Sequence, residues 1–213
     1  MSELAFAILG AEPQPYAAAP QLVLRARVTE STGVRIHAIT LRAQIRLEPQ
    51  RRRYDAGESA RMSELFGGPE RYGDTLRPLL WTHVAQTVVA FDGEADFDII
   101  VPCSYDFEVA ANKYLSALAG GEIPLVVQFS GTVFVRARDG GVAAELIPWT
   151  CEAYFRLPVA VWRATMDAFF PNSAWIRLDR DAFEELYRFK REGGFPTWEA
   201  AIARLCARAE STP

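Results

Sequence analysis

The clearest pattern in the chain is an alternation of apolar and polar residues from Val34 to Glu48 that changes phase once. Up to Ala38 the apolar side chains occupy even positions, and from Ile39 onward they occupy odd positions. A period of two is typical of a strand with one buried face, and a change of phase indicates one extra residue in the strand. The pattern therefore predicts one long strand with a β-bulge or a sharp bend between His37 and Ile39.

Other strand-like segments recur through the first three quarters of the chain and are separated by Pro and Gly. They are Leu4 to Leu9, Leu22 to Thr29, Trp81 to Phe91, Phe97 to Val101, Leu125 to Arg138 and Val142 to Leu157. The sequence Asp139-Gly140-Gly141 is typical of a hairpin turn between the last two. Strands that follow one another in this way favour an antiparallel sandwich over a βαβ sheet. We therefore expect a mainly β, α+β fold, with an antiparallel β-sandwich over residues 1–157.

Helical spacing of apolar residues interrupts this pattern twice and then dominates the end of the chain. Glu58 to Phe66 and Phe107 to Leu118 are each followed by a Gly-Gly pair, a common helix stop. Three more helices are expected after Leu157, where Pro158, Asp181 and Thr197 suit helix starts. The apolar stripe on the first of these consists of Val159, Trp162, Met166, Phe169 and Phe170. Residues 158–213 are therefore expected to form an α-helical extension packed on the sandwich as a single structural unit.

The composition is that of a folded protein without a secretory or membrane segment. Half of the 213 residues are hydrophobic, which is enough for a substantial core and too many for a disordered chain. The segment after Met1 has neither the basic start nor the apolar run of a signal peptide. Cys103, Cys151 and Cys206 are an odd number of cysteines without paired spacing, so reduced thiols are expected. We therefore expect a cytoplasmic protein with no transmembrane segment.

Charge is distributed unevenly along the chain. Met1 to Tyr54 contains eight arginines and four acidic residues, a charge of +4, so the remainder carries −8 to give the total of −4. The acidic residues Asp92, Glu94, Asp96, Asp98, Asp106 and Glu108 follow one another without an intervening basic residue. We therefore expect one basic flank and one acidic flank.

Three residues, His83, Cys103 and Asp106, are weak candidates for catalysis, and His83 and Cys103 also have a structural explanation. His83 lies among aromatic and apolar neighbours that could exclude water and shift its pKa. Cys103 lies near an expected helix start that could activate its thiol, but the nearby carboxylate of Asp106 would oppose a thiolate. The structural alternative is that His83 and Cys103 are packing residues.

Motifs for phosphate, nucleotide, metalloprotease or calcium chemistry are missing from the sequence. His37, His83, Cys103 and Cys151 have the side chains of zinc ligands, but no two of them have the local spacing of a metal site. We therefore expect no cofactor and no metal.

The polar motif with the most distinctive chemistry is a line of arginines. Alternation places Arg42 and Arg46 on one side of a strand, and Arg51, Arg52 and Arg53 prolong that side. Guanidinium groups bind carboxylates bidentately, so the line is suited to an acidic protein partner. The acidic total argues against a nucleic-acid partner. The alternative is a solvated edge that prevents aggregation of the sheet.

Several stretches also resemble a known protein family. They are Ile36 to Ile39, Glu48 to Tyr54, Gly73 to His83, Tyr105 to Glu108 and Phe129 to Phe134. On these stretches nearly the whole chain resembles an uncharacterised family, a domain of unknown function found mainly in actinobacteria. Genes of that family often neighbour those of nickel-iron hydrogenases, so the resemblance implies an accessory or assembly role, and it supplies no catalytic residues.

A weaker resemblance, of the β-helix-β order from Val101 to Phe134, is to the sandwich of water-stress and late-embryogenesis proteins, and it concerns the fold alone. Taken together, the chain is expected to be a non-catalytic accessory protein that binds an acidic protein, such as a hydrogenase component. The alternative is an enzyme of unknown reaction centred on His83 with Cys103 or Asp106.

Overall fold

The structure is a computed structural model that describes residues 2–104, 106, 109–136, 140–171, 173 and 176–210. The chain divides into two compact units, Met1–Ala174 and Trp175–Pro213, which are considered separately. In the described parts of the chain, no helix combines the length and the apolarity that a membrane span needs.

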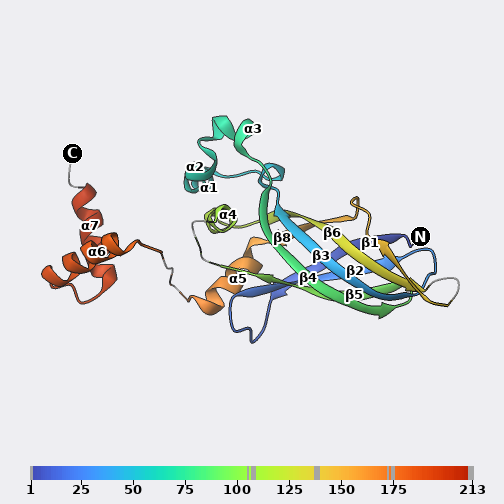
Figure 1. The fold of residues 1–213 in the computed structure, drawn as a ribbon. Coiled ribbons are helices and arrows are strands. Elements are labelled where there is room, and N and C mark those ends of the chain that lie inside the picture. Colours follow the sequence, from blue (N-terminus) through green and yellow to red (C-terminus); the bar gives the residue numbers. More distant parts are fainter. Residues whose placement is uncertain are drawn as a thin grey trace. The chain divides into compact units, whose positions relative to one another are not determined.

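The first unit contains two antiparallel sheets (Figure 1). The three-stranded sheet has the order β1-β2-β5 and consists of β1 (Leu4–Pro13), β2 (Gln21–Glu30) and β5 (Glu94–Pro102). The five-stranded sheet has the order β4-β3-β6-β7, with β8 also paired to β6. Its strands are β3 (Ile36–Leu47), β4 (Leu79–Phe91), β6 (Glu122–Arg136), β7 (Val142–Leu146) and β8 (Glu152–Pro158). The expected mainly β, α+β sandwich is confirmed.

A single hydrophobic core lies between the two sheets. Apolar residues alternate into it along each inner strand, as Leu22, Leu24 and Val28 do on β2. The ring of Phe6 on β1 stacks on that of Phe129 on β6, with ring centroids 4.2 Å apart. Burial of each large apolar side chain contributes about 1.5–3 kcal/mol, so the alternation in the sequence is what brings the sheets together.

The change of phase in the sequence corresponds to a β-bulge at His37. The register between β3 and β6 shifts between Ile36 and Ala38, and His37 is exposed. Ile36 and Ile39, three positions apart, are both fully buried. The predicted bulge is therefore confirmed, although the strand begins at Ile36 and not at Val34.

The expected strand from Val142 to Leu157 is in fact two strands. β7 pairs with the second half of β6 and β8 pairs with the first half, and a turn at Pro148 separates them. Pro148 has no backbone N–H, so it cannot continue the ladder.

On β6 itself, Gly131 has a φ of 137° and its missing Cβ would lie 1.9 Å from the carbonyl oxygen of Thr40. Only glycine allows the two strands to approach this closely.

Helices occupy two crossovers of the sandwich and follow its last strand. The link from β3 to β4 contains η1 (Pro49–Arg51), α1 (Ala56–Arg61), α2 (Ser63–Phe66), η2 (Pro69–Arg71) and α3 (Tyr72–Thr75). It lies at one end of the sandwich (Figure 1). α4 (Ala110–Ala117) links β5 to β6, and the earlier part of the helix expected there, including Phe107, lies outside the described residues.

α5 (Val159–Phe169) begins directly after Pro158 and buries Trp162 and Met166 in the core of the sandwich. The first compact unit therefore includes α5.

The second unit is a pair of helices, α6 (Arg180–Glu192) and α7 (Trp198–Glu210). Asp179 caps α6 by accepting a hydrogen bond of 2.8 Å from the backbone N–H of Ala182, so the cap lies two residues before the expected Asp181. Thr197 accepts a hydrogen bond of 3.2 Å from the backbone N–H of Ala200 and caps α7 as predicted. Docking of this unit on the sandwich stays a prediction.

Candidate functional site

The candidate site surrounds the segment that leaves the end of β3. Pro49 starts the short helix η1, where its lack of an N–H costs nothing, and Arg52 to Asp55 then lead into α1. Hollows lie on two sides of this segment, and Arg52 and Arg53 line both of them. One hollow is basic and the other is largely apolar.

The basic hollow has a volume of about 620 Å³. Its charged lining residues are the acid Glu122 and the arginines Arg51, Arg52, Arg53 and Arg156. Arg156 comes from β8 and lies 3.7 Å from the Glu122 carboxylate. Four guanidinium groups therefore surround a hollow that has one carboxylate in its lining.

The buried carboxylate of Glu48 contacts two residues that line the basic hollow, Gln50 and Arg51. Glu48 is only 3% exposed. Arg46 donates to it at 3.4 Å, Gln50 donates at 2.5 Å, and the Nε of Arg51 lies 3.5 Å away. The guanidinium of Arg51 also lies 5.0 Å from the ring centroid of Tyr154. These contacts orient Arg51 and neutralise part of the charge of Arg46.

Arg52 is held by a second buried carboxylate, that of Glu58 on α1. Its Nη2 donates to the two oxygens of Glu58 at 2.8 and 2.9 Å, and the two side chains are 11% and 4% exposed. Oε1 of Glu58 also accepts a hydrogen bond of 2.8 Å from the N–H of Ala119. Arg52 further reaches the carbonyls of Gly120 and Glu122, each at 3.3 Å. Arg52 is therefore a structural link between the helical insertion and the loop before β6.

Arg53 is exposed, as Arg51 is, but it differs from Arg51 and Arg52 because, among the described residues, no ion pair or hydrogen bond engages its guanidinium. Arg42 is also exposed, but it lies in a separate hollow on the outer face of the five-stranded sheet, with Ala85 and Ser130. The predicted line of arginines is thus divided. The structure brings Arg51, Arg52 and Arg53 together, engages Arg46 with Glu48, and leaves Arg42 apart.

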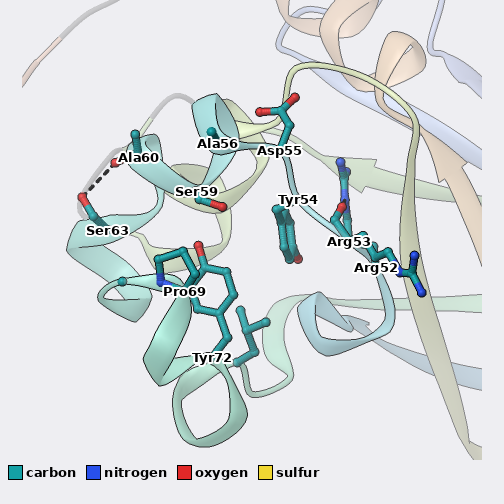
Figure 2. A pocket seen from close by; sticks show the side chains of 12 residues that line it. Arg52, Arg53, Tyr54, Asp55, Ala56, Ser59, Ala60, Ser63, Pro69 and Tyr72 are labelled. Carbon is teal, nitrogen blue, oxygen red and sulfur yellow. Dashed lines mark hydrogen bonds between the residues drawn. The ribbon is translucent and has the colours of Figure 1, made fainter.

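The largely apolar hollow has a volume of about 750 Å³ and lies between the Arg52–Asp55 segment and helices α1 to α3 (Figure 2). Its apolar and aromatic lining consists of Tyr54, Ala56, Ala60, Pro69, Tyr72 and Leu76. Figure 2 shows the two arginines at one end, beyond Tyr54, and Pro69 with Tyr72 at the other. The hollow therefore joins an apolar wall to a cationic rim.

The aromatic rings of this hollow are fixed in place. The Tyr54 hydroxyl donates to the Pro49 carbonyl at 2.6 Å and lies 2.9 Å from the Tyr114 hydroxyl. Burial raises the pKa of Tyr54 and raises that of Tyr114 to about 12, so both hydroxyls stay protonated. The rings of Tyr54 and Tyr72 meet edge to face with centroids 6.0 Å apart. The Tyr72 hydroxyl oxygen is buried and has no hydrogen-bond partner within the described residues.

The candidate catalytic residues do not form a common site in the described structure. His83 is exposed on β4, and its Nε2 lies 3.3 Å from the amide oxygen of Gln44. Cys103 is buried beyond the end of β5, in the other sheet, and its thiol donates to the Val101 carbonyl at 3.7 Å. Burial raises the pKa of Cys103 to about 12, which disfavours a thiolate. Asp106 lies in the loop beyond Cys103, where its backbone N–H bonds to Ser104. The imidazole of His83 is therefore exposed to solvent, whereas the thiol of Cys103 is buried.

Three acids of the expected acidic flank, Asp92, Glu94 and Asp96, are paired with arginines. Arg27 lies opposite Asp96 in the β2–β5 register, and its Nε is 2.6 Å from that carboxylate and its Nη1 is 3.3 Å from Glu94. Arg35 lies 3.5 Å from Asp92. Glu108 lies outside the described residues. Sequence inspection missed this pairing because the partners are up to 69 residues apart.

Two residues of the site were not anticipated from the sequence. Arg156 reaches the basic hollow from β8, and the polar alternation of Glu152, Tyr154 and Arg156 was the available signal. Tyr72 lines the apolar hollow from α3. No pattern in the sequence connects Tyr72 to Tyr54.

Comparison with known proteins identifies a family but no activity. No curated protein matches the chain. A selenomethionine-labelled β-glucosidase from Kluyveromyces marxianus is similar in structure over 73% of this chain and 15% of its own, with 7% identity and a TM-score of 0.27. A similarity at that level carries no argument about fold or function. The family of unknown function DUF6084 matches residues 1–213, and the chain therefore belongs to that family.

Proposed function

We propose that this protein is a non-catalytic accessory or assembly factor whose basic hollow docks an acidic segment of a protein partner. The observation that carries the proposal is the gathering of Arg51, Arg53 and Arg156 around one hollow. The buried carboxylates of Glu48 and Glu58 contact Arg51 and Arg52, while the guanidinium of Arg53 is unpaired among the described residues. Guanidinium groups arranged in this way suit carboxylates of a partner.

A protein is favoured over a nucleic acid because part of the exposed positive charge is already paired and the net charge is negative. The exposed arginines of the three-stranded sheet, Arg25 and Arg27, are already paired with Glu12 and Asp96. With a net charge of −4, the protein as a whole repels a long polyanion. The resemblance to a hydrogenase-associated family makes components of a nickel-iron hydrogenase assembly the first partners to test, in the cytoplasm and without a cofactor.

The test compares two charge reversals on exposed arginines. The tagged full-length chain is used to capture partners from its native host, and the affinity for the purified partner is then measured over a salt series. We expect Arg53→Glu to lower the affinity about tenfold, mainly through slower association, and to weaken its salt dependence. Arg42→Glu, equally exposed but outside the hollow, is the matched control and should bind like the unaltered protein.

Two results would require the proposal to be abandoned. One is an equal affinity of the Arg53→Glu variant and the unaltered protein for every captured partner. The other is tight, salt-sensitive binding of generic DNA or RNA by the unaltered protein.

A further inference from the structure

The apolar hollow adjoins the basic hollow, and both are lined by Arg52 and Arg53. We propose that it is an anchor pocket, which takes one large apolar side chain, aromatic or leucine-like, from the acidic segment that docks in the basic hollow. The inference rests on the proposed function and specifies the partner: an acidic peptide segment with a bulky apolar residue next to its carboxylates.

The lining and rigidity of the hollow suit such an anchor. Its volume of about 750 Å³ is ample for one large side chain together with neighbouring peptide backbone, and its wall combines Tyr54, Tyr72, Pro69 and Leu76. Tyr54 is fixed by hydrogen bonds to Pro49 and to Tyr114. A preorganised aromatic wall lowers the entropy cost of binding, and a few anchors of this type supply most of the affinity of many interfaces.

The wall opposite Tyr54 is also held by contacts within the fold. Met62 and Phe66 of the helical insertion are buried in the core. Nε of Arg61 donates to the Ala117 carbonyl at 2.7 Å, and Lys113 pairs with Glu64. These contacts tie α1 and α2 to α4, so the hollow is part of the folded unit and does not depend on a partner to form.

Charge identifies the occupant as an acidic peptide. Arg53, exposed and unpaired among the described residues, lines both hollows. Because it directly precedes Tyr54, a carboxylate on Arg53 and an anchor beside Tyr54 would belong to residues about one to three positions apart, given the reach of roughly 3.5 Å per residue in an extended chain. A small amphiphile with one carboxylate would leave the further arginines, Arg51 and Arg156, unused.

The experiment measures binding of short fluorescent peptides to the full-length chain by anisotropy. The first peptide has one phenylalanine between two pairs of acidic residues, the second has alanine in its place, and the third keeps phenylalanine but replaces the acids with their amides. We expect the second and third to bind at least about tenfold more weakly than the first.

Two tryptophan variants test the location of the anchor. Ala60→Trp fills the apolar hollow from an exposed position on α1. It should abolish the advantage of the phenylalanine peptide over the alanine peptide. Ala90→Trp is the matched control, because Ala90 is equally exposed and lies near the end of β4 that pairs with the start of β3, away from the site. It should leave both peptides unchanged.

The outcomes separate the two proposals. Equal binding of the phenylalanine and alanine peptides, with loss of both in Arg53→Glu, would overturn the anchor pocket and leave the proposed function intact. No binding of any acidic peptide, with no effect of Arg53→Glu on a captured partner, would overturn both. Binding of decanoate in the hollow more tightly than the phenylalanine peptide would assign it to a small amphiphile and also overturn the inference.

Discussion

Arginines meet carboxylates in two regions of the first unit, the outer face of the three-stranded sheet and the segment after β3. On the sheet, Arg27 faces Asp96 directly across the β2–β5 ladder, at 2.6 Å, and both side chains are exposed to water. After β3, Glu48 and Glu58 are each 3% exposed and contact Arg51 and Arg52. Both regions pair arginines with acidic residues, but the acids are exposed on the sheet and buried after β3.

That difference decides which arginines are available to a partner. On the sheet, Arg25 and Arg27 pair with acids that are also exposed to solvent. The hydrogen bond from Arg27 lowers the pKa of the Asp96 carboxyl. After β3 the buried acids contact Arg51 and Arg52, and Arg53 has no acid of its own among the described residues. The count of arginines in a stretch of sequence therefore says less about binding than the burial of their partners.

The largest expected effect is the loss of a buried ion pair. Arg52→Ala leaves the Glu58 carboxylate buried without its guanidinium, and we expect it to lower the free energy of unfolding by about 3–5 kcal/mol. Urea denaturation measures this loss, and Arg27→Ala, on the exposed ladder, should lose far less stability. Equal losses in the two variants would remove the distinction between the regions.

A smaller and pH-dependent effect is expected at Glu30, the buried carboxylate at the end of β2. Burial by itself would raise its pKa, but the hydroxyl of Thr32 and the N–H groups of Glu3, Thr32 and Val34 donate to it and lower the pKa below the ordinary value near 4.5. A folded-state pKa below the unfolded one stabilises the fold above about pH 4.5, and this stabilisation is lost as the pH falls through the folded value.

We therefore expect the unaltered protein to lose stability more steeply than Glu30→Gln as the pH falls below about 4.5, in urea denaturation over a pH series. Asp96→Asn, on the exposed face of the same sheet, is the control and should change the pH profile less. Parallel profiles for the unaltered protein and Glu30→Gln would contradict the role of the hydrogen bonds to Glu30.

The smallest effect is expected for the exposed pair of Arg27 and Asp96. A double-mutant cycle with Arg27→Ala and Asp96→Ala should show weak coupling that shrinks as salt is added, because exposed ion pairs are screened. A coupling that stays constant up to molar salt would mean that this pair behaves like the buried one.

Much of the fold could be predicted from the sequence because strand alternation is a local property. The change of phase near His37 located the bulge of β3, and the alternation located most strands of both sheets. The break between β7 and β8 was missed, because apolar residues continue through the turn and the effect of Pro148 on the ladder was not considered. His83 was expected to be shielded, but its neighbours in sequence point to the opposite face of the strand, so it is exposed.

The site depended more on tertiary structure. The sequence by itself placed Arg51, Arg52 and Arg53 side by side and determined the strand faces that form the core, since both follow from adjacency and from a period of two. Only the folded chain brought Arg156 beside them, paired Arg52 with Glu58, set Arg42 apart and faced Tyr72 toward Tyr54. These relations depend on which distant segments meet at one end of the sandwich, and that is decided by strand pairing and by burial of the whole core.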